Sequence, residues 1–187
     1  MTITNARKDD APFIARAIMD AVGEEICKSL AGDGHSLADV ERLFTELAAR
    51  DDSQYSYVNT LAAVDEDGKT LGVCVGYDGA KLDELRKPFF AYVREMLGKD
   101  LGDVEDETDG SEFYLDTLAV LPEYRGRGIA SALLKASIEK ARKMGKPAGL
   151  LVDKDNTRAR RLYESIGFEQ IGERPFCYVM MDHLQCK

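Results

Sequence analysis

The sequence predicts one domain of mixed α/β or α+β class. Its 187 residues match the usual size of a single domain, about 100–200 residues. Short apolar or β-branched runs alternate with segments of helical period along the whole chain. No repeat, linker or compositional boundary interrupts that alternation, so we expect a single domain over residues 1–187.

The N-terminal quarter is predicted to be one strand followed by two helices. Residues 2–6 are expected to form the strand. Apolar side chains recur at every fourth position from Asp10 to Leu30, which predicts one long amphipathic helix. Ser36 is expected to cap the next helix, with Asp39 at its third position and apolar residues on one face through Leu47.

A hairpin and an interrupted helix are predicted next. The runs 57–64 and 70–77 are apolar or β-branched, and the turn between them contains Gly68, which tolerates a positive φ. Residues 81–97 have helical period, but Pro88 lies inside them. Because proline lacks an N–H and clashes with the preceding turn, we expect this helix to be kinked or split in two.

The C-terminal half begins with an acidic stretch and then alternates strands and helices. Residues 100–112 hold seven acidic and no basic side chains, which predicts an exposed loop. The elements expected after it are a strongly apolar strand at 113–121, a helix at 129–141, a strand at 148–152, a helix at 157–166 closed by Gly167, and a last strand at 176–181.

Charge is distributed unevenly along the chain. The sequence has 25 Lys+Arg and 34 Asp+Glu, for a net charge of −9, but residues 1–120 contribute −14 and residues 121–187 contribute +5. The overall acidity argues against a protein that binds nucleic acid or an anionic membrane, since both partners require a basic surface. This uneven charge is expected if the C-terminal part binds an anionic ligand and the N-terminal part a cationic one. The alternative is a chance asymmetry of a solvated surface.

Cysteine spacing and the N-terminal residues bear on metal binding and location. The four cysteines form no CxxC pair and the chain has two histidines, so no metal site is expected. The first ten residues lack the apolar segment of a signal peptide, and no run reaches the ~18 apolar residues of a membrane helix. We therefore expect a cytoplasmic protein with reduced thiols.

A glycine-rich loop between a strand and a helix predicts an anion-binding site. Arg125, Gly126, Arg127 and Gly128 connect the apolar strand to the helix that begins at Ile129. Helix N-termini present unpaired N–H groups and the positive end of the helix dipole, and glycines let an anion approach the backbone. The loop matches neither the Walker pattern nor the dinucleotide-binding fingerprint. The alternative is an ordinary surface turn.

Together with a second motif about 30 residues further on, this loop resembles the GCN5-related N-acetyltransferase (GNAT) superfamily, which uses acetyl-coenzyme A. The family's loop pattern is Q/R-x-x-G-x-G/A, and its second marker is an Asn, then an Ala, then LYE-x-x-GF. The matching positions are Arg125, Gly128, Ala130, Asn156, Ala159 and 162–168. The specific match covers residues 113–170. It implies the GNAT fold, a mixed sheet of about six to seven strands, splayed at the cofactor site and flanked by helices.

The resemblance implies that acetyl-CoA is the cosubstrate and that no metal takes part. In the family, backbone groups of the strand before the loop contact the pantetheine arm, and the loop binds the pyrophosphate. An asparagine after the next strand also contacts the pantetheine. The cofactor-binding residues implied for this chain are Leu118, Ala119, Val120, Arg125, Gly126, Arg127, Gly128, Ile129, Ala130 and Asn156.

Three residues are candidates for catalysis. Tyr163 matches the tyrosine that protonates the departing thiolate in much of the family; the alternative is that its ring only packs in the core. Strand alternation places Glu112 and Asp116 on the face that leads to the acetyl position, so either is a candidate base. Asp116 could instead form an ion pair or cap. Tyr114 stands where some members carry a catalytic glutamate, which leaves the base open.

The sequence therefore predicts an N-acetyltransferase that moves the acetyl group of acetyl-CoA directly to a primary amine in a ternary complex. The acidic stretch favours a cationic small molecule or a peptide amine as acceptor; otherwise it is a solvated loop. Two alternatives are a weak or inactive CoA-binding regulatory module and a protein that binds another phosphate ligand. No nucleic acid or membrane partner is expected. Many similar proteins are dimers, which allows a homodimer that the sequence does not specify.

Overall fold

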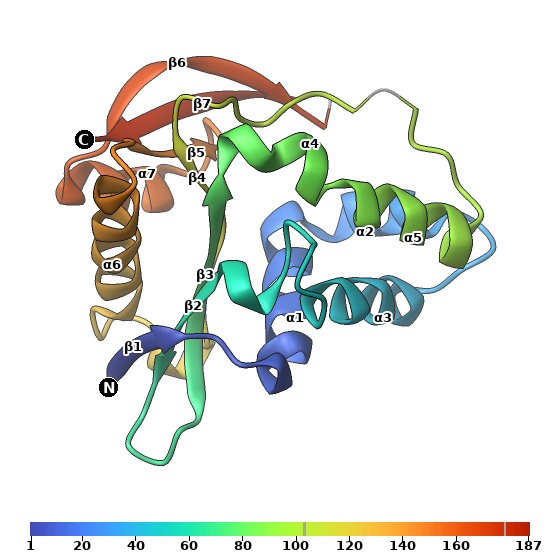
Figure 1. Ribbon diagram of the computed structural model, residues 1–187, viewed down its shortest axis with the longest axis horizontal. Coiled ribbons are helices and arrows are strands. Elements are labelled where there is room, and N and C mark those ends of the chain that lie inside the picture. Colours follow the sequence, from blue (N-terminus) through green and yellow to red (C-terminus); the bar gives the residue numbers. More distant parts are fainter. Residues whose placement is uncertain (103, 178) are drawn as a thin grey trace.

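The computed structural model describes residues 1–102, 104–177 and 179–187, and one sheet runs through the middle of them (Figure 1). Its seven strands have the order β1-β2-β3-β4-β5-β7-β6. All neighbours are antiparallel except β4 and β5, which are parallel. The strands are β1 (Thr2–Asn5), β2 (Thr60–Val64), β3 (Thr70–Asp78), β4 (Phe113–Val120), β5 (Ala148–Val152), β6 (Glu169–Phe176) and β7 (Val179–Cys186).

Helices cover both faces of the sheet, which confirms the predicted class. Figure 1 shows α1, α2, α3 and α5 on one side and α6 and α7 on the other. A separate cluster of buried apolar side chains fills the space on each side, with Ile14 and Leu43 in one cluster and Leu133 and Phe168 in the other. The helices are α1 (Ala11–Val22), α2 (Glu24–Ala31), α3 (Leu37–Ala48), α4 (Leu82–Leu85), α5 (Lys87–Leu97), α6 (Ile129–Lys143) and α7 (Thr157–Ile166).

Local signals in the N-terminal half are confirmed. The Ser36 hydroxyl accepts the Asp39 amide at 3.3 Å, and the Asp39 carboxylate accepts the Ser36 amide at 2.9 Å, so α3 begins with the expected capping box. The β2–β3 hairpin turns at Gly68, whose φ is +79°. Pro88 lies in the first turn of α5, and α4 ends at Leu85, so the proline separates two helices.

Two predicted elements are wrong. The long helix expected from Asp10 to Leu30 is divided into α1 and α2, because Gly23 between them adopts a φ of +89°, outside the helical region. The last strand, expected at 176–181, is two antiparallel strands, β6 and β7. Most residues of β6 are exposed, since it is an edge strand, so it lacks the apolar alternation that reveals a half-buried strand.

The acidic stretch is only partly the exposed loop that was expected. Its described residues, 100–102 and 104–112, form no helix or strand, and position 103 lies outside the description. Glu107, Thr108 and Glu112 are nevertheless buried. The stretch therefore contributes to the interior of the protein, although its composition is that of a solvated segment.

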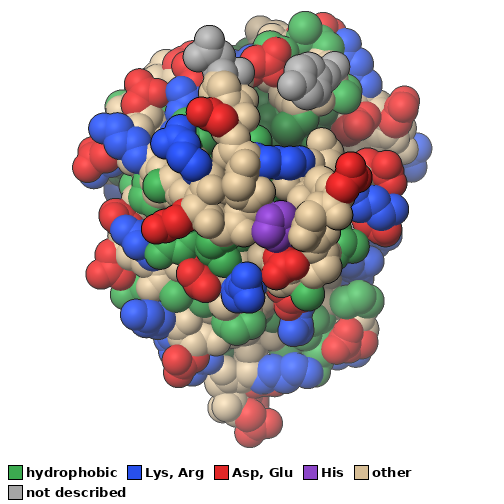
Figure 2. Space-filling view, turned by 90° about the vertical axis from the view of Figure 1, so that its right-hand side faces the viewer, with side chains coloured by type: hydrophobic (Ala, Val, Ile, Leu, Met, Phe, Trp, Pro, Cys, Tyr) green, Lys and Arg blue, Asp and Glu red, His purple; other side chains and the backbone are tan. Residues whose placement is uncertain are grey.

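The surface beside the helices α2, α3 and α5 carries charges of both signs. Figure 2 shows this side of the molecule, where acidic and basic side chains are interspersed. The negative charge of the N-terminal part is thus not collected into one acidic area on this face. No helix in the described ranges is both long enough and apolar enough to cross a membrane.

The parallel strands β4 and β5 separate soon after they meet. Backbone partners are found only at Phe113 and Tyr114 of β4, although β4 continues to Val120. A bulge bends β4 at the same place, because Leu115 and Thr117 face consecutive residues of β3 and Asp116 between them faces none. The expected splay of the sheet is therefore present: β4 and β5 are unpaired beyond Tyr114, and the bulge lies at Asp116.

Candidate active site

A cleft with a volume of about 730 Å³ opens where β4 and β5 separate. Its walls come from α1, the second half of β4, the loop before α6, the end of β5, the start of α7 and the last two strands. Of the residues predicted for the site, those that line the cleft are Asp116, Leu118, Ala119, Val120, Arg125, Gly126, Gly128, Ile129, Ala130, Asn156 and Tyr163. Glu112 and Arg127 do not line it. A second cavity, of about 530 Å³ between α2 and α3, contains none of the predicted residues.

The loop before α6 has the backbone geometry of an anion site. Gly126 and Gly128 have φ values of +76° and +79°, which strain any residue with a side chain. A Cβ atom at either position would meet nothing within 4 Å, so glycine is required by the backbone rather than by crowding. The cap residue of α6, Gly128, offers no side-chain acceptor, and the amides of the first turn at Ile129 and Ala130 border the cleft. These amides can receive an anionic group.

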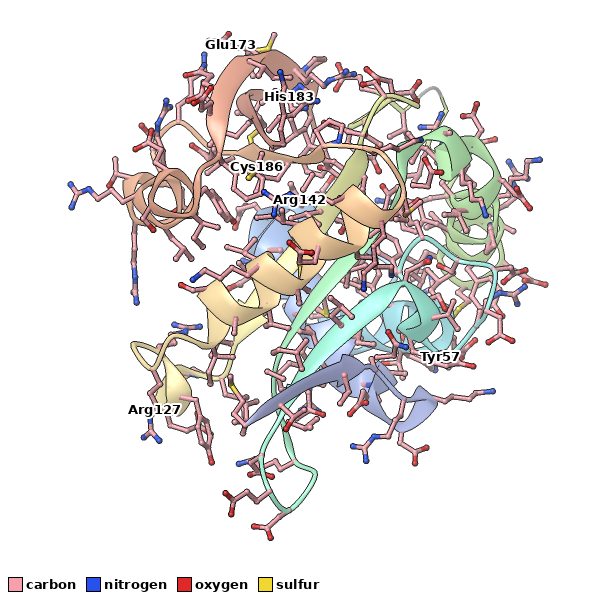
Figure 3. The ribbon with its side chains drawn as sticks, turned by 60° about the vertical axis from the view of Figure 1, so that its left-hand side comes forward. Tyr57, Arg127, Arg142, Glu173, His183 and Cys186 are labelled. Atoms are coloured by element: carbon pink, nitrogen blue, oxygen red, sulfur yellow. The ribbon has the colours of Figure 1, made fainter. Side chains whose placement is uncertain are left out.

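The two loop arginines are placed differently. The Arg125 Nε atom donates to the Val120 carbonyl oxygen at 3.1 Å, which ties this side chain to the end of β4 at the cleft. The Arg127 guanidinium lies over the ring of Tyr124, 5.1 Å from its centroid, and Figure 3 shows it at the outer end of the loop. The expected contribution of the Arg127 side chain to the cleft is therefore absent. Arg158 of α7 lines the cleft, although it was not predicted.

Asn156 and the second half of β4 offer polar groups along the middle of the cleft. Beyond Tyr114, the described residues of β5 make no ladder with β4, so that edge of residues 118–120 faces the cleft. The Asn156 Oδ1 atom accepts the Ala159 amide at 3.1 Å and caps α7. The asparagine thus has a structural role, while its amide nitrogen is available to a ligand.

Tyr163 packs in the core and also borders the cleft. Its ring packs against Phe168, with centroids 5.8 Å apart and planes at 60°, and the side chain also borders the cleft. Burial, assisted by the nearby Cys74 thiol, raises the pKa of Tyr163 to about 12. The phenol is therefore protonated at neutral pH and can act as a proton donor.

Asp116 is a carboxyl group that titrates near neutral pH. The bulge turns it toward the cleft, and the Thr117 hydroxyl donates to its Oδ1 atom at 2.8 Å. Burial, and secondly the negative charge of Glu107, raise the pKa of Asp116 to about 7. Among the described residues it forms no salt bridge, so the alternative of an ion pair is not observed. This group can accept a proton from an ammonium at the cleft.

Glu112 does not lie where strand alternation predicted. It precedes β4 and is fully buried over Gly149 of β5, where a Cβ atom would overlap its carboxylate. Thr108 Oγ1 and Gln185 Nε2 each donate to it at 2.7 Å, and His183 Nε2 lies 2.8 Å away. Burial opposes its ionisation, but these hydrogen bonds outweigh burial and hold the pKa of Glu112 below its usual range. A carboxylate enclosed in this way is placed for a structural role.

The partner of Glu112, His183, joins the acidic stretch to the last two strands. Arg174 Nε donates to His183 Nδ1 at 3.3 Å, so the ring hydrogen is on Nε2 and points to Glu112. Arg174 also pairs with Asp109. Figure 3 shows His183 on β7, beside the strand β6 that carries the labelled Glu173. The sequence offered no signal for this network, because His183 and Glu112 are 71 positions apart.

Charged residues of both signs line the cleft. The cations are Arg125 and Arg158, and the carboxylates are Asp20, Glu107, Asp116 and Asp153. Asp20, Glu107 and Asp153 were not predicted individually, since none belongs to a motif. The cleft can therefore bind an anionic group at the loop before α6, and it also offers carboxylates to a cationic group.

The sequence and the fold are both similar to those of known acetyltransferases. Residues 24–168 match the model of the acetyltransferase (GNAT) family. A crystal structure of an acetyltransferase is 30% identical and superposes with a TM-score of 0.80, covering 100% of this chain and 99% of the other. The structure of yncA from Salmonella typhimurium, solved with its cofactor acetyl-CoA, is 19% identical with a TM-score of 0.59, covering 100% and 92%.

Curated relatives match a shorter segment. The N-alpha-acetyltransferase RimI of Mycobacterium tuberculosis is 41% identical over 63 residues, which cover 34% of this chain and 39% of that protein. An uncharacterised protein of Mycobacterium leprae is 46% identical over 68 residues, covering 36% and 18%. The chain thus spans less than half the length of these relatives.

The buried network predicts a large stability effect for Glu112. Replacing it by alanine leaves the buried donors of His183 and Gln185 without their acceptor, so Glu112→Ala should lower the free energy of unfolding by about 3 kcal/mol. Glu105→Ala, in the exposed part of the same stretch, should change it by less than about 0.5 kcal/mol. Urea denaturation at neutral pH measures both, and equal stabilities would contradict the structural role.

The same network has a defined pH dependence. The folded-state pKa of Glu112 is lowered, so its contribution is complete above the pKa of the unfolded chain and is lost as the pH falls through the folded value. The difference in stability between the wild type and Glu112→Ala should therefore shrink in acid.

Proposed function

The chain belongs to the acetyltransferase (GNAT) family, and from this premise we propose that it transfers the acetyl group of acetyl-CoA to a primary amine in a ternary complex. The observation that carries the proposal is the cleft between the separated strands β4 and β5. It joins an anion site at the start of α6 to a carboxyl group and a phenol, Asp116 and Tyr163. A carboxyl group with a pKa near 7 can accept a proton from the acceptor, and a protonated phenol can donate one to the leaving sulfur.

The residues present fit acetyl-CoA as the cosubstrate. The loop amides from Gly126 to Ala130 and the Arg125 side chain would bind its pyrophosphate, since that end of the cleft is cationic and presents unpaired N–H groups. The edge of residues 118–120 and the amide nitrogen of Asn156 would hold the pantetheine arm. The related yncA structure with acetyl-CoA supports this assignment. When bound, acetyl-CoA supplies the thioester carbon that the acceptor attacks.

Proton transfers at two residues complete the reaction. The acceptor ammonium gives a proton to the Asp116 carboxylate and becomes a free amine. Its nitrogen then forms a bond to the thioester carbon, the carbon–sulfur bond breaks, and the departing sulfur takes the proton of Tyr163. The second proton lost by the nitrogen leaves to solvent, from which Tyr163 is reprotonated. Backbone amides near Val120 would stabilise the carbonyl oxygen as its negative charge develops.

A cationic acceptor is supported by the carboxylates of the cleft. Asp20, Glu107 and Asp116 line it. An ammonium compound entering there gains favourable electrostatic interactions, whereas a carboxylate would be repelled. A small molecule with a second positive group and the terminal amine of a peptide both satisfy this requirement, and the name of the RimI relative supports the second.

An acceptor panel tests the function. With acetyl-CoA present, the release of CoA thiol should depend on the charge of the amine. The kcat/KM for amines with a second positive group should be at least about tenfold above that for amines of equal length carrying a carboxylate, a difference of ~1.4 kcal/mol. Thiol-trapping absorbance measures the release, and mass spectrometry confirms the acetylated product. Release of no thiol with any amine, while acetyl-CoA binds, would instead indicate a CoA-binding module without transferase activity.

Asp116 is expected to set the acidic limb of the pH profile. Its carboxylate must be deprotonated to accept a proton, so kcat/KM should rise with pH through a midpoint near 7. Asp116→Asn should lower kcat by ~10²–10⁴-fold and abolish that limb while leaving CoA affinity unchanged. Steady-state kinetics between pH 5 and 9 and calorimetric titration with CoA provide the measurements. Full activity in Asp116→Asn would remove this residue from the reaction.

Tyr163→Phe tests the proton donor. The variant keeps the ring that packs on Phe168, so the fold and the CoA dissociation constant should be retained while kcat falls by ~10²-fold or more. Tyr57→Phe is a matched control, because it removes a hydroxyl from a tyrosine that does not line the cleft. If both variants turned over at the wild-type rate, the thiolate would have to be protonated by another group.

A further inference from the structure

The buried carboxylate of Glu107 has so far been given a part in attracting the acceptor but none in the proton transfer. It is 6% exposed, yet it borders the cleft that contains Asp116. We propose that Glu107 is a positioning residue for the proton-accepting carboxyl group: held in place by Tyr77 and Gln54, it sets a second carboxylate beside Asp116, and the pair takes up the acceptor's proton. This inference rests on the proposed function, in which Asp116 is the base.

Neutral groups hold Glu107. The Tyr77 hydroxyl donates to its Oε1 atom at 2.8 Å, and Gln54 Nε2 donates to the same atom at 3.2 Å. Both donors are buried. Within the described part of the chain, no lysine, arginine or histidine forms a salt bridge with Glu107. Its carboxylate is therefore held by hydrogen bonds from neutral groups. The nearby Arg86 guanidinium pairs with Asp106 and makes no salt bridge with Glu107.

The segment that carries Glu107 is anchored on both sides. Figure 1 shows the acidic stretch running from the end of α5 over the top of the sheet to β4. Asp106, on one side of Glu107, pairs with Arg86 at 2.6 Å. On the other side, Thr108 donates to Glu112 at 2.7 Å, and Lys146 donates to the Gly110 carbonyl oxygen at 2.7 Å. These contacts attach the stretch on both sides of Glu107, whose carboxylate borders the cleft.

Glu107 and Asp116 line the same cleft. Gln54 holds Glu107 through its side-chain amide at 3.2 Å, and the charge of Glu107 acts on Asp116 within this cleft. Two like charges in a poorly hydrated site disfavour each other's ionisation, so one of the pair binds a proton more readily than an isolated carboxyl group does.

The other groups around Asp116 do not cancel this effect. The titratable groups that face it are the phenols of Tyr55, Tyr77 and Tyr114 and the thiol of Cys74, all neutral at pH 7. The Thr117 hydroxyl donates a hydrogen bond to it, and Thr117 and Gln54 both favour its ionised form. Burial and the Glu107 charge act in the opposite direction and dominate, consistent with a pKa near 7 for Asp116. Among the groups around Asp116, Glu107 is the one whose charge a substitution can remove.

Glu107→Gln tests the proposal because the glutamine oxygen can still accept from Tyr77 and Gln54. Removal of the charge should lower the pKa of Asp116, so the acidic limb of the kcat/KM profile should move to lower pH by about one unit. Glu105→Gln removes the same charge from an exposed position in the same stretch and should leave the limb in place. Glu107→Asp, which keeps the charge, should restore a limb close to the wild-type position.

The outcomes separate this proposal from the proposed function. A limb that stays near pH 7 in Glu107→Gln, with activity absent in Asp116→Asn, would overturn the role of Glu107 while Asp116 remained the base. Full activity in Asp116→Asn would instead overturn the base itself. A rise in KM without movement of the limb would assign Glu107 to acceptor binding and also overturn the proposal. If Glu107→Gln does not fold, Glu107→Met provides a neutral side chain of similar size for the same profile.

Discussion

The separation of β4 from β5 is the constraint on which the rest of the site depends. Parallel strands normally remain paired because each unpaired backbone group in the interior is costly. Here β4 leaves its partner after Tyr114, and the bulge at Asp116 turns the strand away. The unpaired edge becomes a binding surface for an extended polar molecule. The same bulge points a carboxyl group into the space that it creates, so the binding surface and the candidate base have one structural origin.

Charge is organised around this opening by local contacts rather than by the net charge of each half of the chain. Arg127 stacks on Tyr124, and Arg174 pairs with Asp109, so neither cation lines the cleft. Most acidic groups of the stretch before β4 are likewise used for attachment. What remains at the cleft is a small set of groups without partners of opposite charge.

How well the sequence predicted each feature depended on the range of the interaction that produces it. The capping box at Ser36 and the glycine loop at 126–128 were predicted because contacts within a few residues determine them. The break at Gly23 was missed because the apolar stripe continues across it, and β6 was missed because an exposed edge strand needs no apolar face. Glu112 was placed on the wrong surface, since strand alternation does not extend to a residue outside the strand.

The sequence by itself determined the family, the order of most elements and the glycine-rich loop before α6, because these depend on residues close together in the chain. It also identified Tyr163 and Asp116 as candidates for proton transfer. Only the tertiary structure decided which acidic residue faces the cleft and which is enclosed. Glu107 meets Tyr77 and Gln54, and Glu112 meets His183, across separations of 30 to 71 positions. No local pattern encodes contacts of that range, since they arise only when the sheet is complete.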